Sequence, residues 1–187
     1  MKTEQQYFEQ SVTIQEYMDN MSVLKEPSFS IYESFEVPQD GFAEQLKALN
    51  LHILAITEDW CGDAMLNNPI IRKVAEAAGV EVRTALRDAD TDLIDRHLTN
   101  GGRAIPIYLL LNEAGEVVGK WGPRAPELQQ VVDEGRAALP SKEDPQFEEK
   151  TKAFYMQLQK SYAETPAYWT AVYESFKKAV LALKVRS

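Results

Sequence analysis

The sequence has few of the residues that build disulfides and metal centres. Its 187 residues include one cysteine, Cys61, and two histidines, His52 and His97. A single cysteine excludes an internal disulfide, and one cysteine with two separated histidines falls short of a zinc site. We therefore expect no metal and no cofactor. The lone cysteine also fits the reducing environment of the cytoplasm.

Positive charge and long apolar runs are scarce as well. The chain has 20 Lys and Arg against 29 Asp and Glu, which gives a formal net charge of −9. Nucleic acids and anionic lipids both need clustered cations, so this balance argues against either partner. The apolar runs are too short to span a membrane, and the first residues do not resemble a signal peptide. The sequence predicts a cytoplasmic protein without a nucleic-acid or membrane partner.

Apolar residues are plentiful, at 44% of the chain, which suffices for the core of one domain with additions. The centre of the chain, residues 38–139, alternates between helical and strand patterns. Its order is that of a parallel βαβ unit followed by a β-hairpin and a helix, which predicts an α/β domain. The helices are expected at residues 40–49, 61–78, 91–98 and 125–139, and the strands at residues 51–56, 80–86, 107–111 and 116–121.

Two flanking regions complete the predicted organisation. Residues 1–37 are expected to form one leading helix over 4–24, ended by Pro27, and then a stretch that could be a strand. Residues 140–187 begin with a polar linker and continue into two helices, residues 145–163 and 166–184. Both helices carry stripes of aromatic and aliphatic side chains, so this region is expected to be a helical hairpin packed on the domain or on another subunit.

Cys61 follows the apolar strand and precedes a helical pattern. A helix N-terminus offers unpaired N–H groups and partial positive charge, and both favour a thiolate. Asp63 acts in the opposite direction, because a carboxylate near the sulfur raises the thiol pKa. We expect the helix terminus to prevail and Cys61 to be a partly exposed thiol with a lowered pKa. A small, buried and inert cysteine is the alternative.

Residues 60–64 read Trp-Cys-Gly-Asp-Ala, and this sequence resembles the active-site sequence Trp-Cys-Gly-Pro-Cys of the thioredoxin family. Pro69 stands eight residues after Cys61, where thioredoxins carry a proline that kinks the active-site helix. The resemblance covers residues 38–139. It implies a thioredoxin-like fold, with a central mixed sheet flanked by helices, an N-terminal helix and a C-terminal two-helix extension.

The resemblance also implies which residues form the site. Cys61 would be the catalytic thiol, and residues 103–107, Arg-Ala-Ile-Pro-Ile, resemble the family's loop that ends in a cis-proline. That loop offers backbone groups to an extended peptide or a thiol ligand. Trp121-Gly122 stands where the family has a glycine beside the substrate groove. The substrate-binding residues expected on this basis are Trp60, Gly62, Asp63, Ile105, Pro106 and Gly122.

Three arginines are expected to surround Cys61 although the chain is acidic overall. Arg87 ends a strand at the edge where open α/β sheets bind ligands, Arg103 precedes the proline loop, and Arg124 begins a helix. Guanidinium groups recognise carboxylates, so we count Arg103 and Arg124 among the substrate-binding residues. The alternative is local pairing with the neighbouring acids Asp88, Asp90 or Glu127.

Two positions depart from the family pattern. Ala64 replaces the second cysteine that resolves a mixed disulfide, and Ala55 replaces the buried aspartate that serves this step as proton acceptor. Both parts of the resolving machinery are absent together. An ordinary dithiol reductase is therefore excluded.

Three functions remain open. Cys61 could exchange disulfides as a single thiol, with a protein or low-molecular-weight thiol as substrate and an external thiol to complete the cycle. The chain could instead be a redox-inert interaction module that binds a peptide or partner protein at the proline groove, with self-association through the helical extension. Cys61 could also be a sensor that passes through sulfenic acid.

Overall fold

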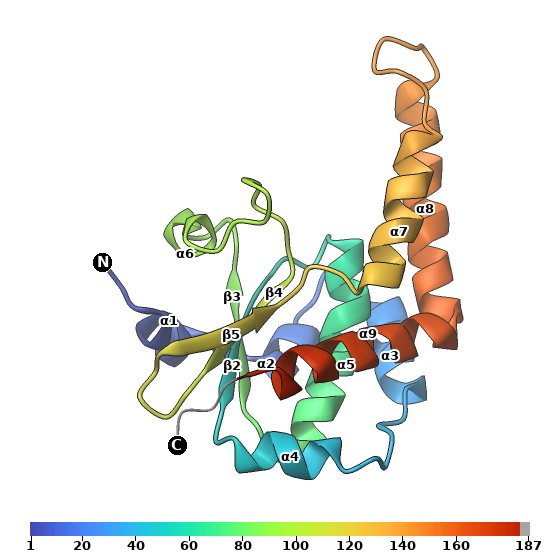
Figure 1. Cartoon of the computed structure of the whole chain (residues 1–187). Helices are drawn as coiled ribbons and strands as arrows, with labels where there is room; N and C mark the ends of the chain where they lie inside the picture. The colour runs from blue at the N-terminus through green and yellow to red at the C-terminus, as the bar shows by residue number, and fades with distance from the viewer. Residues whose placement is uncertain (184–187) are drawn as a thin grey trace.

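The fold is built on a mixed five-stranded sheet within the described residues of the computed structural model, residues 1–183 (Figure 1). The strand order is β1-β3-β2-β4-β5. β2 and β3 run parallel and the other neighbours are antiparallel, which confirms the predicted mixed sheet. The strands are β1 (Val12–Thr13), β2 (His52–Thr57), β3 (Val82–Leu86), β4 (Ile107–Leu111) and β5 (Val117–Trp121).

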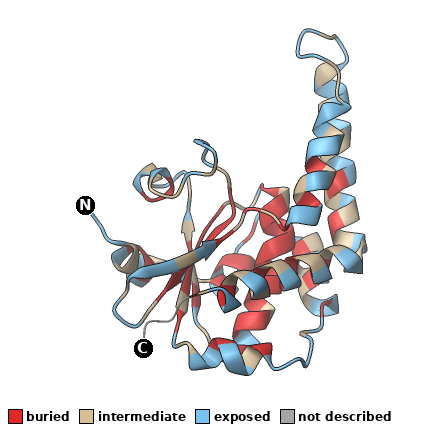
Figure 2. Ribbon diagram, in the orientation of Figure 1, coloured by how far each residue is buried: buried red, intermediate tan, exposed pale blue. Residues whose placement is uncertain are grey.

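Helices cover both faces of the sheet and thereby create two cores (Figure 2). Side chains alternate along β2, so that Ile53 and Ala55 join the larger core and Leu54 and Ile56 join the smaller one. The larger core includes side chains from α2 (Ile14–Asp19), α3 (Lys25–Ser34), α4 (Phe42–Ala48), α5 (Gly62–Ala78), α7 (Pro126–Ala137), α8 (Phe147–Glu164) and α9 (Pro166–Leu181). The smaller core includes side chains from α1 (Glu4–Gln10) and α6 (Thr91–Asp95).

The predicted single helix over residues 4–24 is wrong. The structure has α1 and α2 in this region, separated by β1, which pairs antiparallel with β3 at the edge of the sheet. The side chain of Thr13 accepts a hydrogen bond from the backbone N–H of Glu16 and so caps the start of α2. The free edge of β3 and this cap together favour the extended conformation over a continuous helix.

The prediction that Pro27 ends a helix is also wrong, because Pro27 lies in the first turn of α3. A proline is tolerated there since the N–H groups of the first turn have no partner within the helix. The following residues, 28–34, are therefore helical, and the possible strand over residues 28–37 does not form.

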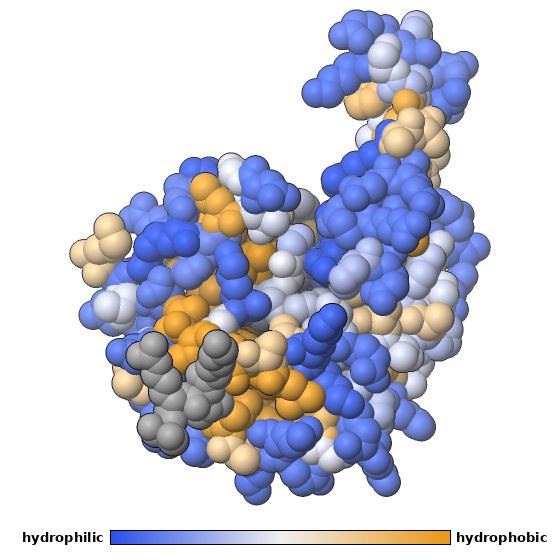
Figure 3. Space-filling view, viewed as in Figure 1, coloured by the Kyte–Doolittle hydropathy of each residue, from blue (hydrophilic) through white to orange (hydrophobic). Residues whose placement is uncertain are grey.

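The C-terminal extension is helical, as predicted. α9 packs against α5, α7 and β5, while α8 contacts α3 and α5. α7 and α8 form a hairpin that projects from the body, and its outer part is hydrophilic (Figure 3). The last residue of the predicted second helix, Lys184, lies outside the described residues. None of the described helices is long and apolar enough to cross a membrane.

Candidate functional site

The site begins at the junction between β2 and α5. β2 ends at Thr57, and Cys61 follows as the N-cap of α5, with extended backbone angles. The connecting loop is anchored at Asp59, whose carboxylate accepts hydrogen bonds from the backbone N–H groups of Ser22 and Val23. The predicted strand–thiol–helix arrangement is therefore present, and the loop that carries the thiol is held in place.

The Cys61 thiol is buried, with 9% of the residue exposed. Its Sγ donates to the backbone carbonyl of Ile105 at 3.6 Å. Burial raises the pKa of Cys61 to about 11, and the charge of Asp63 adds to this shift, while the N–H groups of Ala64 and Asp63 oppose it. The predicted exposed thiol with a lowered pKa is wrong, because the loss of hydration outweighs the helix terminus.

Asp63 lies in the first turn of α5 and binds one side chain from the loop between β5 and α7 and one from α8. Its Oδ2 pairs with Nη2 of Arg124 at 2.7 Å, and its Oδ1 accepts a hydrogen bond from the hydroxyl of Tyr162 at 2.9 Å. Burial by itself would lower the pKa of Arg124. The charge and the hydrogen bond of Asp63 outweigh burial, so the pKa of Arg124 is raised. Both oxygens of the carboxylate are thus engaged by the protein, and α8 is tied to the start of α5.

The proline loop lies beside the thiol. The Ile105–Pro106 peptide bond is cis. Gly122 has a φ of +123°, and any side chain there would collide with the backbone of Pro106, so glycine is required at this close approach. Ile105 presents its carbonyl to Cys61, whereas Pro106 and Gly122 do not line the cavity described next.

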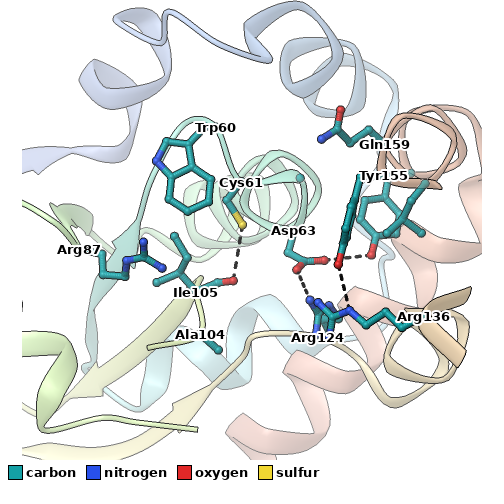
Figure 4. Close-up of a pocket in the computed structure, with 13 residues that line it drawn as sticks. Trp60, Cys61, Asp63, Arg87, Ala104, Ile105, Arg124, Arg136, Tyr155 and Gln159 are labelled. Atoms are coloured by element: carbon teal, nitrogen blue, oxygen red, sulfur yellow. Dashed lines mark hydrogen bonds and ion pairs between the residues drawn. The ribbon is translucent and has the colours of Figure 1, made fainter. Parts of the chain in front are cut away.

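A cavity of about 440 Å³ opens next to Cys61 (Figure 4). Figure 4 shows Trp60 and Arg87 on one side of Cys61 and Tyr155 on the other. Trp60 is 48% exposed, and the Arg87 guanidinium lies over its ring at 5.0 Å from the centroid. The lining residues are Trp60, Cys61, Gly62, Asp63, Arg87, Ala104, Ile105, Arg124, Arg136, Tyr155, Leu158, Gln159 and Tyr162.

Of the three predicted arginines, the structure brings two to this cavity. Arg124 pairs with Asp63, and Arg87 pairs with Asp88 at 2.9 Å. Arg103 does not line the cavity, and its guanidinium pairs with Asp95 at 2.7 Å. The expected substrate contact by the Arg103 side chain is therefore absent from this arrangement, although its carbonyl accepts a hydrogen bond from Arg87.

Sequence reasoning missed the contribution of the α7–α8 hairpin. Arg136 comes from α7, while Tyr155, Leu158, Gln159 and Tyr162 come from α8. The apolar stripe of α8 indicated which face is buried. It contained no signal for what that face packs against, because periodicity describes one helix at a time.

A family model described as thioredoxin matches residues 11–138. The chain belongs to the thioredoxin family. This thioredoxin-family protein is similar to two solved structures that share the fold. One is an HIV epitope scaffold, with a TM-score of 0.65, 16% identity and coverage of 96% of this chain and 98% of the other.

The other is a protein of unknown function from Pseudomonas aeruginosa, with a TM-score of 0.58, 20% identity and coverage of 93% and 98%. No curated protein matches the chain. The described residues contain no group of three His, Cys, Asp or Glu side chains that could hold a metal ion.

Proposed function

We propose that this thioredoxin-family protein is a redox-inert binding module, which takes its ligand in the cavity beside Cys61 and does not exchange disulfides. The observation that carries the proposal is the position of α8 over the start of α5. Gln159 packs on Gly62, and Tyr162 holds Asp63. These contacts place α8 beside the residues that follow Cys61, and Cys61 itself, 9% exposed, contributes to the cavity wall with its thiol donated to the Ile105 carbonyl.

The state of the thiol agrees with this function. Disulfide exchange starts from a thiolate, and a thiol with a pKa of about 11 is ionised in about one molecule in 10⁴ at pH 7. The higher nucleophilicity of a more basic thiolate offsets only part of this loss. Ala64 then leaves no internal thiol to release a mixed disulfide. Monothiol exchange and sulfenic-acid sensing both need the ionised, accessible sulfur that this site withholds.

The shape of the site favours a compact ligand over an extended peptide. The Ile105 carbonyl, which the family resemblance assigns to peptide binding, already accepts the Cys61 thiol. The cavity volume of about 440 Å³ lies within the range of small-molecule sites. We therefore propose that the group bound in the cavity is a small molecule or a single side chain of a partner protein.

The test is the rate of iodoacetamide alkylation of Cys61 as a function of pH. The native protein should react far more slowly than free cysteine at pH 7 to 9, with a midpoint near 11. In urea the same thiol should react at the rate of free cysteine, which serves as the control for chemical integrity. A native midpoint at or below about 8.5, the free-thiol value, would refute the proposed function and support exchange by a single thiol.

A further inference from the structure

The cavity beside Cys61 carries more positive than negative charge. Three guanidinium groups line it, from Arg87, Arg124 and Arg136. Arg87 is neutralised by Asp88, and Arg124 is neutralised by Asp63. One positive charge therefore remains, in a protein whose formal net charge is −9.

This remaining charge belongs to Arg136. Its Nε donates to the hydroxyl of Tyr155 at 3.0 Å, which fixes the guanidinium at the cavity. No carboxylate among residues 1–183 forms an ion pair with it. Its two terminal NH₂ groups are available to a ligand, and a guanidinium presents such donors in the geometry of a carboxylate.

A second unmet donor belongs to Arg124, which also lines the cavity. Nε of Arg124 is buried without a hydrogen-bond partner, although its Nη1 donates to Gln129 and its Nη2 pairs with Asp63. This atom has almost no accessible surface, so a ligand in the cavity does not reach it and it adds no donor to those of Arg136. The charge and the donors that the described residues leave unused at this cavity are therefore those of Arg136.

Apart from the amide of Gln159, the rest of the lining is apolar or aromatic. Trp60 provides an exposed ring, and Ile105 and Leu158 provide aliphatic surface. A ligand that matches both the unpaired charge of Arg136 and the apolar lining carries one negative charge and an apolar body. Two negative charges would exceed the single unpaired cation, so a phosphate monoester fits the charge balance less well than a carboxylate.

We propose that the cavity binds a small monocarboxylate with an apolar or aromatic body, with its carboxylate on Arg136 and its body between Trp60 and Leu158. This inference rests on the proposed function, since it assigns a ligand class to the same cavity. Arg136 and Tyr155 both come from the α7–α8 hairpin, so the hairpin supplies the specificity of the site.

The experiment titrates the ¹⁵N-labelled protein with 3-phenylpropionate and follows the indole N–H signal of Trp60, which is assigned with the Trp60→Phe variant. The uncharged 3-phenylpropionamide and the cationic 3-phenylpropylamine have the same aromatic body and serve as matched ligands. We expect the carboxylate to bind and the other two to bind at least about ten-fold more weakly, because a charge-assisted contact is lost.

Two variants locate the interaction. Arg136→Gln should weaken the binding of 3-phenylpropionate about ten-fold or more, since the bidentate contact is removed. Arg103→Gln changes the net charge equally, but its guanidinium lies outside the cavity and pairs with Asp95, so it should leave the affinity unchanged. Both side chains are exposed enough for the fold to tolerate the change.

The inference is overturned if the amide binds as well as the carboxylate, if none of the three compounds binds, or if both variants weaken binding equally. Equal weakening would mean that the overall field of the protein is responsible. The alkylation experiment judges the proposed function separately. Binding of the amide with an unreactive Cys61 would leave a redox-inert binding module without carboxylate specificity.

Discussion

The two helices of the C-terminal extension have different roles although they follow each other in the chain. α9 buries five side chains in the larger core: Trp169, Val172, Tyr173, Phe176 and Val180. α8 buries only Leu158 and Tyr162, and both of these line the cavity beside Cys61. The comparison indicates that α9 stabilises the domain, whereas α8 shapes the site.

The polar contacts of the two helices follow the same division. In α9, the hydroxyl of Tyr173 donates to both oxygens of Asp40 at 2.9 Å, and Lys177 pairs with the same carboxylate. This contact joins α9 to the segment before α4, far from the thiol. In α8, the hydroxyl of Tyr162 donates to Asp63, which lines the cavity beside Cys61. A disturbance of α9 should therefore affect stability, and a disturbance of α8 should affect the reactivity of Cys61.

The largest effect is expected from Phe176→Ala in α9. Phe176 is 1% exposed and packs on the rings of Phe42 and Trp121. Removal of a buried phenyl ring leaves a cavity in the core and should lower the free energy of unfolding by about 3–5 kcal/mol. Urea unfolding followed by circular dichroism measures this loss. An unchanged stability would contradict the structural role of α9.

A smaller effect on stability, but a larger one on the site, is expected from Tyr162→Phe in α8. The variant deprives Asp63 of one partner and should cost about 1–2 kcal/mol. It also loosens the contact between α8 and α5, so Cys61 should be alkylated faster in the native state.

Met156→Gln is the matched control for Tyr162→Phe. Met156 lies on the same helix and is 62% exposed, so its replacement should change neither stability nor alkylation rate. If both variants exposed Cys61 equally, the effect would arise from the helix as a whole and the tyrosine–aspartate contact would have no special part.

The smallest effect is expected from Asp40→Asn, and it depends on pH. The hydrogen bond from Lys177 lowers the pKa of Asp40 from 3.8 to about 2. The folded state thus favours the carboxylate, and its contribution to stability is fully present above pH 3.8 and is lost as the pH falls towards 2.

Wild type should accordingly exceed Asp40→Asn by on the order of 1 kcal/mol at neutral pH, because the contact is partly exposed. The difference should vanish near pH 2. Urea unfolding of both proteins at several pH values measures it. A difference that stays constant over this range would show that the charge of Asp40 is not the cause.

Much of the fold could be predicted because the relevant signals are local. The apolar run that became β2, the αL glycine at position 79 and the turn before β5 each specify their element from neighbouring residues. The N-terminal region could not be predicted in the same way. Residues 12 and 13 extend because β3, some seventy positions later, offers its edge to them. The predicted boundaries between residues 37 and 38 and between 139 and 140 stay predictions.

The sequence by itself determined that a lone thiol stands at the start of a helix, that no second cysteine can resolve a disulfide on it, and that a thioredoxin-like sheet carries it. Only the tertiary structure decided that this thiol is buried and that its pKa is raised. The helix terminus acts over one turn and is visible in the sequence, but hydration depends on every surface that approaches the sulfur. Ile105 and the other side chains of the smaller core come from distant positions in the sequence, and burial among them raises the pKa of Cys61.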